Sequence, residues 1–277
     1  MFRQPSRASG RPQSAAAGGG GSWAPSDLGS ALRLWIKADA GITSSGGLIS
    51  QANDQSGNGF HLFSTGTNRP TLNATGYNSL PSIDFAASSS TWLGTQAIGG
   101  AAVPVGLNLG TSCSFFFIGR YTTASDGFGR IMSYLGPTTS AGSGVDYAAA
   151  DCLGAMHRNG SANAFQGTQN SVDLAVGAAT PSSNIRALMV YDGAAHTAQL
   201  YINNSASGSG STGVAAFNLG STGCLAIGTT IQTASGNIST IAANFTGTIA
   251  ELLVTNTALD TTTRGNLDAY VVARLGA

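Results

Sequence analysis

Residues 185–203 constrain the fold more than any other stretch of the chain. From residue 197 to residue 202 polar and apolar side chains alternate strictly, which is the period of two of a half-buried strand. Residues 187–191 are apolar at every position, as expected of a central strand that is covered on both faces. Asp192 and Gly193 lie between the two halves and supply a turn, because glycine accepts positive φ and aspartate tolerates it. The stretch predicts an antiparallel hairpin with Leu200 and Ile202 buried.

Many other short apolar runs repeat this behaviour along the chain and are separated by loops rich in glycine, serine and threonine. The strands that they predict cover residues 32–37, 48–52, 60–63, 80–85, 113–121, 129–135, 153–158, 172–176, 224–229 and 246–255. A helix is expected only at the end of the chain, where Asp260 is an N-cap and Gly276 a stop. Its apolar residues recur at helical spacing, at Leu267, Tyr270, Val271 and Leu275. The pattern predicts an all-β fold, a two-sheet jelly-roll sandwich with a short C-terminal helix.

Charge is scarce in this chain. Charged residues make up 9% of the 277 residues, and Lys37 and Glu251 are the only lysine and the only glutamate. The formal net charge is zero, so no overall field favours nucleic acid or a membrane surface as a partner. A polar but uncharged surface is typical of extracellular and virion β proteins. No apolar stretch reaches the ~20 residues that a membrane span needs, and no signal peptide is recognised at the N-terminus. We therefore expect a virion protein that is assembled in the host cytoplasm.

Residues 1–27 differ from the rest. They carry Arg3, Arg7 and Arg11 and a run of alanine and glycine, with no acidic residue before Asp27. Such a segment cannot bury a core, and it is either a solvated tail or an arm that orders on a partner. Guanidinium groups bind carboxylates with two hydrogen bonds, which favours a docking arm that contacts other virion proteins. The domain boundaries expected are residues 1–27 for the arm and 28–277 for the sandwich, and we expect a homo-oligomer.

The three cysteines, Cys113, Cys152 and Cys224, are widely spaced and match no zinc-binding pattern. Cys113 and Cys224 each begin an apolar run, which favours buried thiols; one disulfide among the three stays open. Calcium is a second question, because Asp54 lies in a turn, residues 53–59, whose residue types suit that ion. Asparagine and aspartate side chains that bond their own backbone explain the same turn without metal, and this interpretation is favoured. No cofactor is expected.

Several stretches, taken in order, resemble a known family. They are Leu-Trp-Ile-Lys-Ala-Asp at 34–39, the turn at 53–59, Arg-Pro at 69–70, Leu-Pro-x-Ile-x-Phe at 80–85, both arms of the hairpin, and Ile-Ala-Glu-Leu-Leu-Val at 249–254. The set, over residues 32–277, resembles the laminin-G-like, concanavalin A-like jelly-roll domains of phage virion proteins and bacterial surface proteins. The resemblance implies the fold, while the function stays open, because the fold hosts lectins, glycosidases, lyases and spacers.

Catalysis is not expected. Retaining glucanases on this fold pair two carboxylates ~5 Å apart, and a chain whose single glutamate is Glu251 cannot build their glutamate motif. Asp146 and Asp151 form the nearest aspartate pair, in a loop where solvated turn residues are the simpler explanation. Glu251 is predicted to be structural, facing a loop or the terminal helix.

A glycan site needs an aromatic platform and planar polar groups on neighbouring loops. Such residues flank the two longest loops, residues 122–129 and 136–151, although each aromatic taken singly is explained equally well as a core residue. The candidate glycan-binding residues are Trp92, Tyr121, Asp126, Tyr134, Asp146, Tyr147 and His157.

The sequence thus favours a non-enzymatic bacteriophage virion surface protein, such as a capsid decoration, head-fibre or tail-associated protein. In this interpretation the N-terminal arm anchors the protein to the phage particle, and the sandwich contacts host glycans. The alternative is a bacterial cell-surface carbohydrate-binding module, and a glycosidase is the third choice.

Overall fold

A computed structural model describes residues 23–95, 107–122, 129–135, 152–159, 164–169, 172–178, 182–211, 224–231, 241–242 and 244–276. Its elements from the start of the chain are η1 Pro25–Ala31, β1 Leu32–Lys37, β2 Ile42–Ser45, β3 Leu48–Ala52, β4 Leu62–Phe63, β5 Thr71–Tyr77, β6 Leu80–Phe85, η2 Ala87–Ser89, β7 Leu93–Gly94, β8 Cys113–Tyr121 and β9 Arg130–Leu135. The remaining elements are β10 Cys152–Asn159, β11 Ala164–Gln169, β12 Val172–Ala178, β13 Ile185–Asp192, β14 Thr197–Ile202, β15 Ser205–Ser211, β16 Cys224–Ile227, β17 Thr230–Ile231, β18 Ile241–Ala242, β19 Gly247–Thr255 and α2 Thr261–Leu275.

The predicted hairpin is confirmed: β13 pairs antiparallel with β14, with Met189 opposite Leu200. Leu200 is fully buried in the core, whereas Ile202, which was also expected to be buried, is only partly buried against it. The turn differs from the expectation, because positive φ falls on His196 and not on Gly193. The carboxylate of Asp192 starts the turn by accepting from the backbone N–H groups of the two alanines after Gly193, at 3.0 and 3.1 Å. Gly193 is needed for a different reason, since a Cβ there would lie 2.0 Å from the carbonyl oxygen of Thr111.

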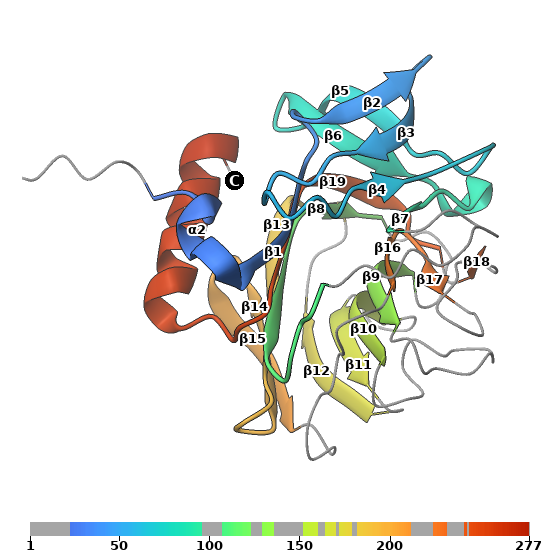
Figure 1. Cartoon of the computed structure of the whole chain (residues 1–277). Helices are drawn as coiled ribbons and strands as arrows, with labels where there is room; N and C mark the ends of the chain where they lie inside the picture. Colours follow the sequence, from blue (N-terminus) through green and yellow to red (C-terminus); the bar gives the residue numbers. More distant parts are fainter. Residues whose placement is uncertain are drawn as a thin grey trace, which may run out of the picture.

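Two sheets form the all-β sandwich (Figure 1). The helix-side sheet has the strand order β15-β14-β13-β8-β19. The other edge of β19 pairs with β1 along its C-terminal half and with β6 along its N-terminal half, and β5 pairs with β6. The far sheet has the order β12-β11-β10-β9-β16-β7-β4-β3-β2. One pairing between β3 and β5, at Leu48 and Thr71, joins the two sheets at an edge.

The central strands of the helix-side sheet are apolar on both faces because each face is covered. In β8, Phe115 and Phe117 point into the main core between the sheets. Phe116 and Ile118 point the other way, into a second core beneath α2. This arrangement confirms the expectation that residues 113–121 form a central strand.

Helix α2 packs on the outer face of the helix-side sheet, with η1 beside it (Figure 1). Its predicted ends are confirmed: the side chain of Asp260 accepts from the N–H of Thr263 at 2.7 Å, and Gly276 ends the helix with a φ of 61°. Leu267, Val271 and Leu275 are its buried residues and face the sheet. No helix in the described part of the chain is long and apolar enough to cross a bilayer.

Candidate functional site

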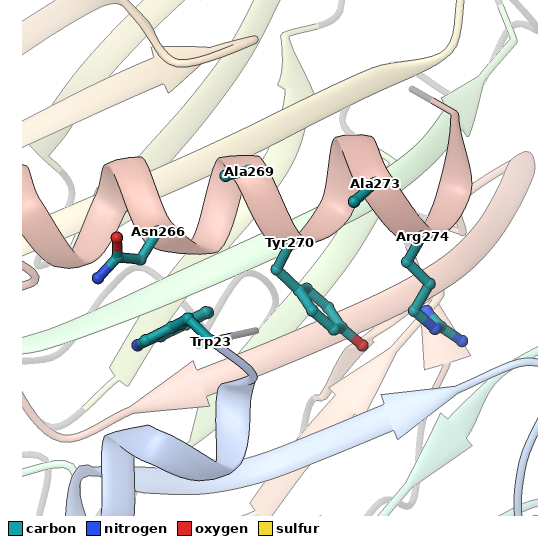
Figure 2. A pocket seen from close by; sticks show the side chains of 6 residues that line it. All are labelled: Trp23, Asn266, Ala269, Tyr270, Ala273 and Arg274. Atoms are coloured by element: carbon teal, nitrogen blue, oxygen red, sulfur yellow. The ribbon is translucent and has the colours of Figure 1, made fainter. Parts of the chain in front are cut away.

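An open groove lies between helix α2 and the segment that leads into η1. Its volume is about 350 Å³, and its lining comprises Trp23, Asn266, Ala269, Tyr270, Ala273 and Arg274. Figure 2 shows Trp23 on the segment facing the helix, with the side chains of Asn266, Tyr270 and Arg274 directed toward the same side. The rings of Trp23 and Tyr270 meet edge to face, with centroids 6.4 Å apart and planes at 74°. The groove therefore combines aromatic surface with one amide and one guanidinium group.

The spacing of residues on α2 produces this lining. Asn266, Tyr270 and Arg274 are four residues apart, so they form a row along one face of the helix. The residue after each of them, at 267, 271 and 275, belongs to the buried row that packs on the sheet. The groove wall is thereby fixed to a rigid element, since its row cannot turn without removing the buried row from the core.

The opposite wall depends on η1. Asp27 closes the turn with Ala24, because its side chain accepts from the N–H of Ala24 at 2.9 Å and its own N–H donates to the carbonyl of Ala24 at 2.9 Å. Pro25 between them is buried. These contacts hold Trp23 over Tyr270, and they place residues 23–27, which were expected to belong to the arm, against the body of the sandwich.

A buried carboxylate lies beneath the groove. Glu251 is fully enclosed, and it accepts from Trp35 Nε1 at 2.5 Å, from the hydroxyl of Tyr270 at 3.2 Å and from Arg274 Nη1. Arg274 Nη2 donates to Asp39 at 2.6 Å. Of the two surroundings expected for Glu251, a loop or the terminal helix, the structure shows the helix. The hydrogen bonds to Glu251 fix both Tyr270 and Arg274 in the groove wall.

A β-bulge in β19 aims Glu251 at the helix. The register between β19 and β8 shifts between Ile249 and Glu251. Ile249 packs in the main core, as does Leu252, whereas Ala250 and Leu253 belong to the core beneath α2. The extra residue reverses the alternation, so Glu251 points to the outer face instead of into the main core.

The surroundings of Glu251 and Tyr270 raise the pKa values of both side chains. Burial raises the pKa of the Glu251 carboxyl above its ordinary value, while the charge of Arg274 and the hydrogen bonds from Trp35 and Tyr270 act in the opposite direction. Burial also raises the pKa of the Tyr270 hydroxyl, and the negative charge of Glu251 adds to that effect. Tyr270 therefore stays a neutral hydrogen-bond donor over the whole physiological range.

Three of the aromatic residues expected at a glycan site lie in the interior instead. Trp92, Tyr121 and Tyr134 are all at most 1% exposed. Tyr121 and Tyr134 belong to the main core between the sheets. A ring enclosed in this way has no face free for a sugar, so the expectation is corrected for these three residues: packing, which the sequence offered as the alternative explanation, accounts for them.

The other expected site residues fall largely outside the described part of the chain. Asp126, Asp146 and Tyr147 lie there, as do Arg3, Arg7 and Arg11 of the expected arm. His157 lies in β10, paired with Gln166 on one side and Arg130 on the other. Among the expected site residues whose side chains the structure describes, Trp92, Tyr121 and Tyr134 do not line the groove.

The turn at residues 53–59 covers an edge of the sheet. The carboxylate of Asp54 accepts from the backbone N–H of Trp35 at 2.9 Å, from the N–H and hydroxyl of Ser56 at 2.8 and 2.7 Å, and from the N–H of Phe60 at 3.1 Å. Asn58 donates to the carbonyl oxygens of residues 32 and 33. The side chains of this turn therefore occupy backbone groups of β1 that a neighbouring strand would otherwise pair.

Metal-binding side chains do not gather elsewhere in the described residues. No group of three or more histidine, cysteine, aspartate or glutamate side chains is found among them. Cys113 is a buried free thiol whose pKa is raised by burial. The backbones of Cys152 and Cys224 begin β10 and β16.

Sequence reasoning missed the groove because it assigned Trp23 to the arm and interpreted α2 only through its buried row. One signal was available: an asparagine, a tyrosine and an arginine repeat every four residues beside that row. Their association with Trp23 depends on a contact between the two ends of the chain, which no local pattern reports.

No protein family model and no curated protein sequence matches the chain. Solved structures do match it. Trypanosoma rangeli sialidase in complex with 2,3-difluorosialic acid matches with a TM-score of 0.54 and 12% identity, over 86% of this chain and 33% of that chain.

The binding domain of botulinum neurotoxin DC matches in two complexes. With rat synaptotagmin II the TM-score is 0.55 at 10% identity, over 90% of this chain and 52% of that chain. With SialylT the TM-score is 0.54 at 10% identity, over 87% and 52%. The chain spans about a third of the sialidase and about half of the toxin chain. At these identities the likeness shows that the chain shares their β-sandwich fold.

Proposed function

We propose that this chain is a carbohydrate-binding module without catalytic activity, and that its ligand occupies the groove between Trp23 and helix α2. One observation carries the proposal: an open groove of about 350 Å³ presents two aromatic rings beside an amide and a guanidinium group on a rigid helix. Sugar rings stack their C–H faces on aromatic rings, and their hydroxyl groups need planar donors and acceptors nearby.

The groove is preorganised for such a ligand. Tyr270 and Arg274 are held from below by Glu251, so their positions are set before any ligand arrives. Ala269 and Ala273 contribute only methyl groups to the lining, which leaves room for a ring above the helix. Asn266 is exposed at one end of the row and offers both a donor and an acceptor.

The burial and pairing of the carboxylates at this site support a binding role over hydrolysis. Glu251 is enclosed and accepts three hydrogen bonds, so it cannot reach a glycosidic bond. Asp39 is paired with both Arg274 and Lys37. Glycoside hydrolysis needs two carboxyl groups on either side of the scissile bond, and the groove offers no such pair among the described residues.

The sequence left two locations open, a phage particle and a bacterial cell surface, and we propose the bacterial cell surface. Ligand binding is what the groove supports, and the fold likeness to chains solved with sialic-acid compounds agrees with it by analogy. The expected docking arm, residues 1–27, lies mostly outside the described residues, so its role in assembly of a phage particle stays a prediction from sequence.

The test is a glycan array with the purified chain, followed by calorimetric titration of each ligand found. We expect binding without hydrolysis, and about tenfold weaker binding by Trp23→Ala. Thr262→Ala, exposed on α2 but outside the groove, is the matched control and should bind like the wild type. The proposal is wrong if no glycan binds, if binding is unchanged in Trp23→Ala, or if ligands are cleaved.

A further inference from the structure

We infer that the groove selects neutral sugars and rejects anionic ones such as sialic acids and uronic acids. The inference rests on the proposed function, and it names the chemical class of the ligand. It follows from the pairing of charges around Arg274, which is the cation that lines the groove.

Both terminal nitrogens of the Arg274 guanidinium group already donate to carboxylates of the chain. Its Nη1 donates to Glu251 and its Nη2 donates to Asp39 at 2.6 Å. A carboxylate on a ligand binds best when it receives both terminal N–H groups of an arginine side by side. Here that arrangement is already divided between two carboxylates of the chain.

The second cation of this region is also engaged. The ammonium group of Lys37 lies 3.7 Å from the other carboxylate oxygen of Asp39 and 5.3 Å from the centroid of the Trp35 ring. Lys37 and Arg274 thus face Asp39 and Glu251, two positive charges against two negative ones. With both carboxyl groups ionised the formal charges of these four side chains sum to zero, so they present no net positive charge that would attract an anion from a distance.

An anionic ligand could receive the two N–H groups that Arg274 already donates only by displacing one of the two carboxylates. Glu251 is fully enclosed and cannot move into solvent. The side chain of Asp39 is 39% exposed, and its carboxylate lies 2.6 Å from Arg274 Nη2. A ligand carboxylate that pairs with Arg274 must therefore compete with Asp39, and the two like charges repel.

The surfaces that remain suit an uncharged ring. Trp23 supplies aromatic surface, Ala269 and Ala273 supply apolar contacts, and Asn266 supplies an amide for hydroxyl groups. These residues contribute no net charge. A ligand of one or two hexose rings fits the cavity volume of about 350 Å³.

The experiment compares neutral ligands with partners that each carry one carboxylate. Methyl glucoside is paired with methyl glucuronide, methyl galactoside with methyl galacturonide, and lactose with 3′-sialyllactose, each titrated against the full chain by NMR. We expect the neutral member of at least one pair to bind at least about tenfold more tightly than its acidic partner, with affinity unchanged between about 20 and about 300 mM sodium chloride.

Variants tie the selectivity to the cluster. Asp39→Asn removes one of the two carboxylates that pair with Arg274. It should therefore strengthen binding of the acidic ligand about threefold and leave binding of the neutral ligand unchanged. Asn266→Ala should weaken the neutral ligand about fivefold. Thr262→Ala again serves as the control, and thermal unfolding verifies that each variant is folded.

The outcomes separate this inference from the proposed function. If acidic partners bind more tightly than neutral ones, in a salt-dependent way that Trp23→Ala weakens, the groove binds glycans but the inference on charge is wrong. If neither these ligands nor any glycan of the array binds, or if Trp23→Ala changes nothing, the proposed function itself fails and the inference falls with it.

Discussion

The indole Nε1 of Trp35 donates to the carboxylate of Glu251 at 2.5 Å, across two strands whose residues are 216 positions apart in sequence. The two residues are diagonal neighbours on the outer face of the sheet, because Trp35 pairs with Leu253 and Lys37 pairs with Glu251. Their bond fixes the carboxylate to which Tyr270 and Arg274 of the helix attach. The helix is therefore held by a polar contact in addition to its apolar row.

Removing this carboxylate should loosen the helix. We expect Glu251→Ala to lower the free energy of unfolding by about 3 kcal/mol, because it leaves Arg274 and two further donors without their acceptor. Glu251→Gln should cost about 1–2 kcal/mol, since the amide oxygen still accepts from Trp35 and Tyr270. Urea unfolding measures both. Val272→Ala, exposed on the same helix, should change stability by less than about 0.5 kcal/mol. A loss of similar size in the control would remove the cluster as the cause.

The same carboxylate makes stability depend on pH. Its pKa in the folded chain is raised above the ordinary value of 4.5, so the folded state binds more protons than the unfolded state between the two pKa values. The contribution of Glu251 is then fully present below pH 4.5 and is lost as pH rises through the folded pKa. Relative to Glu251→Gln, the wild type should lose stability as pH is raised from about 4 to about 7. The opposite trend in paired urea titrations would show that Arg274 outweighs burial.

The turn around Asp54 should be needed for stability and for solubility. Asp54→Ala leaves the N–H of Trp35 without its acceptor and should cost about 2–3 kcal/mol. It should also increase association, because an unpaired strand edge attracts other strands. Asp192→Ala is the comparator, since it removes a turn carboxylate with only two acceptor bonds and should cost about 1 kcal/mol.

Calcium should not replace that network. We expect calcium chloride or a chelator to leave the thermal midpoint of the wild type unchanged, because the oxygens of Asp54 already accept from the backbone and from Ser56. A midpoint that rises with calcium in the wild type but not in Asp54→Ala would instead make this turn a metal site.

Two truncations test where the folded domain begins. Removing residues 1–22 should leave the thermal midpoint and glycan binding unchanged, because Trp23 and Pro25 remain. Removing residues 1–26 deletes both, and should cost about 1–3 kcal/mol through the loss of buried apolar surface. It should also abolish binding in the groove. Equal behaviour of the two truncated chains in calorimetry and titration would contradict the role given to Trp23.

Local patterns predicted much of this fold. Alternation in β14 predicted the burial of Leu200, and an unbroken apolar run predicted β8 between two cores. Asp260 and Gly276 predicted both ends of α2. Each of these features is decided by residues within a few positions of one another, so the sequence reports it directly.

Other features depend on distant partners and could not be predicted in this way. The bulge before Glu251 reverses the strand pattern only because of how β19 pairs with β8. Trp92, Tyr121 and Tyr134 have the chemistry of a sugar platform, and only the packing of two sheets decides that they are interior. Trp23 became part of the candidate site through contact with Tyr270, near the other end of the chain.

The pairing of β1 with β19 has a consequence for how the chain is made. Of the described strands, β1 comes earliest in the chain and β19 comes latest, and their register joins Leu32 to Thr255. During translation β1 cannot pair with β19 until the residues between them have been made, which favours slow folding and exposes β1 to neighbouring nascent chains. The Asp54 turn follows β1 within about twenty residues. It can cover one edge of β1 before β19 has been synthesised, and it thereby protects that edge from pairing with other nascent chains.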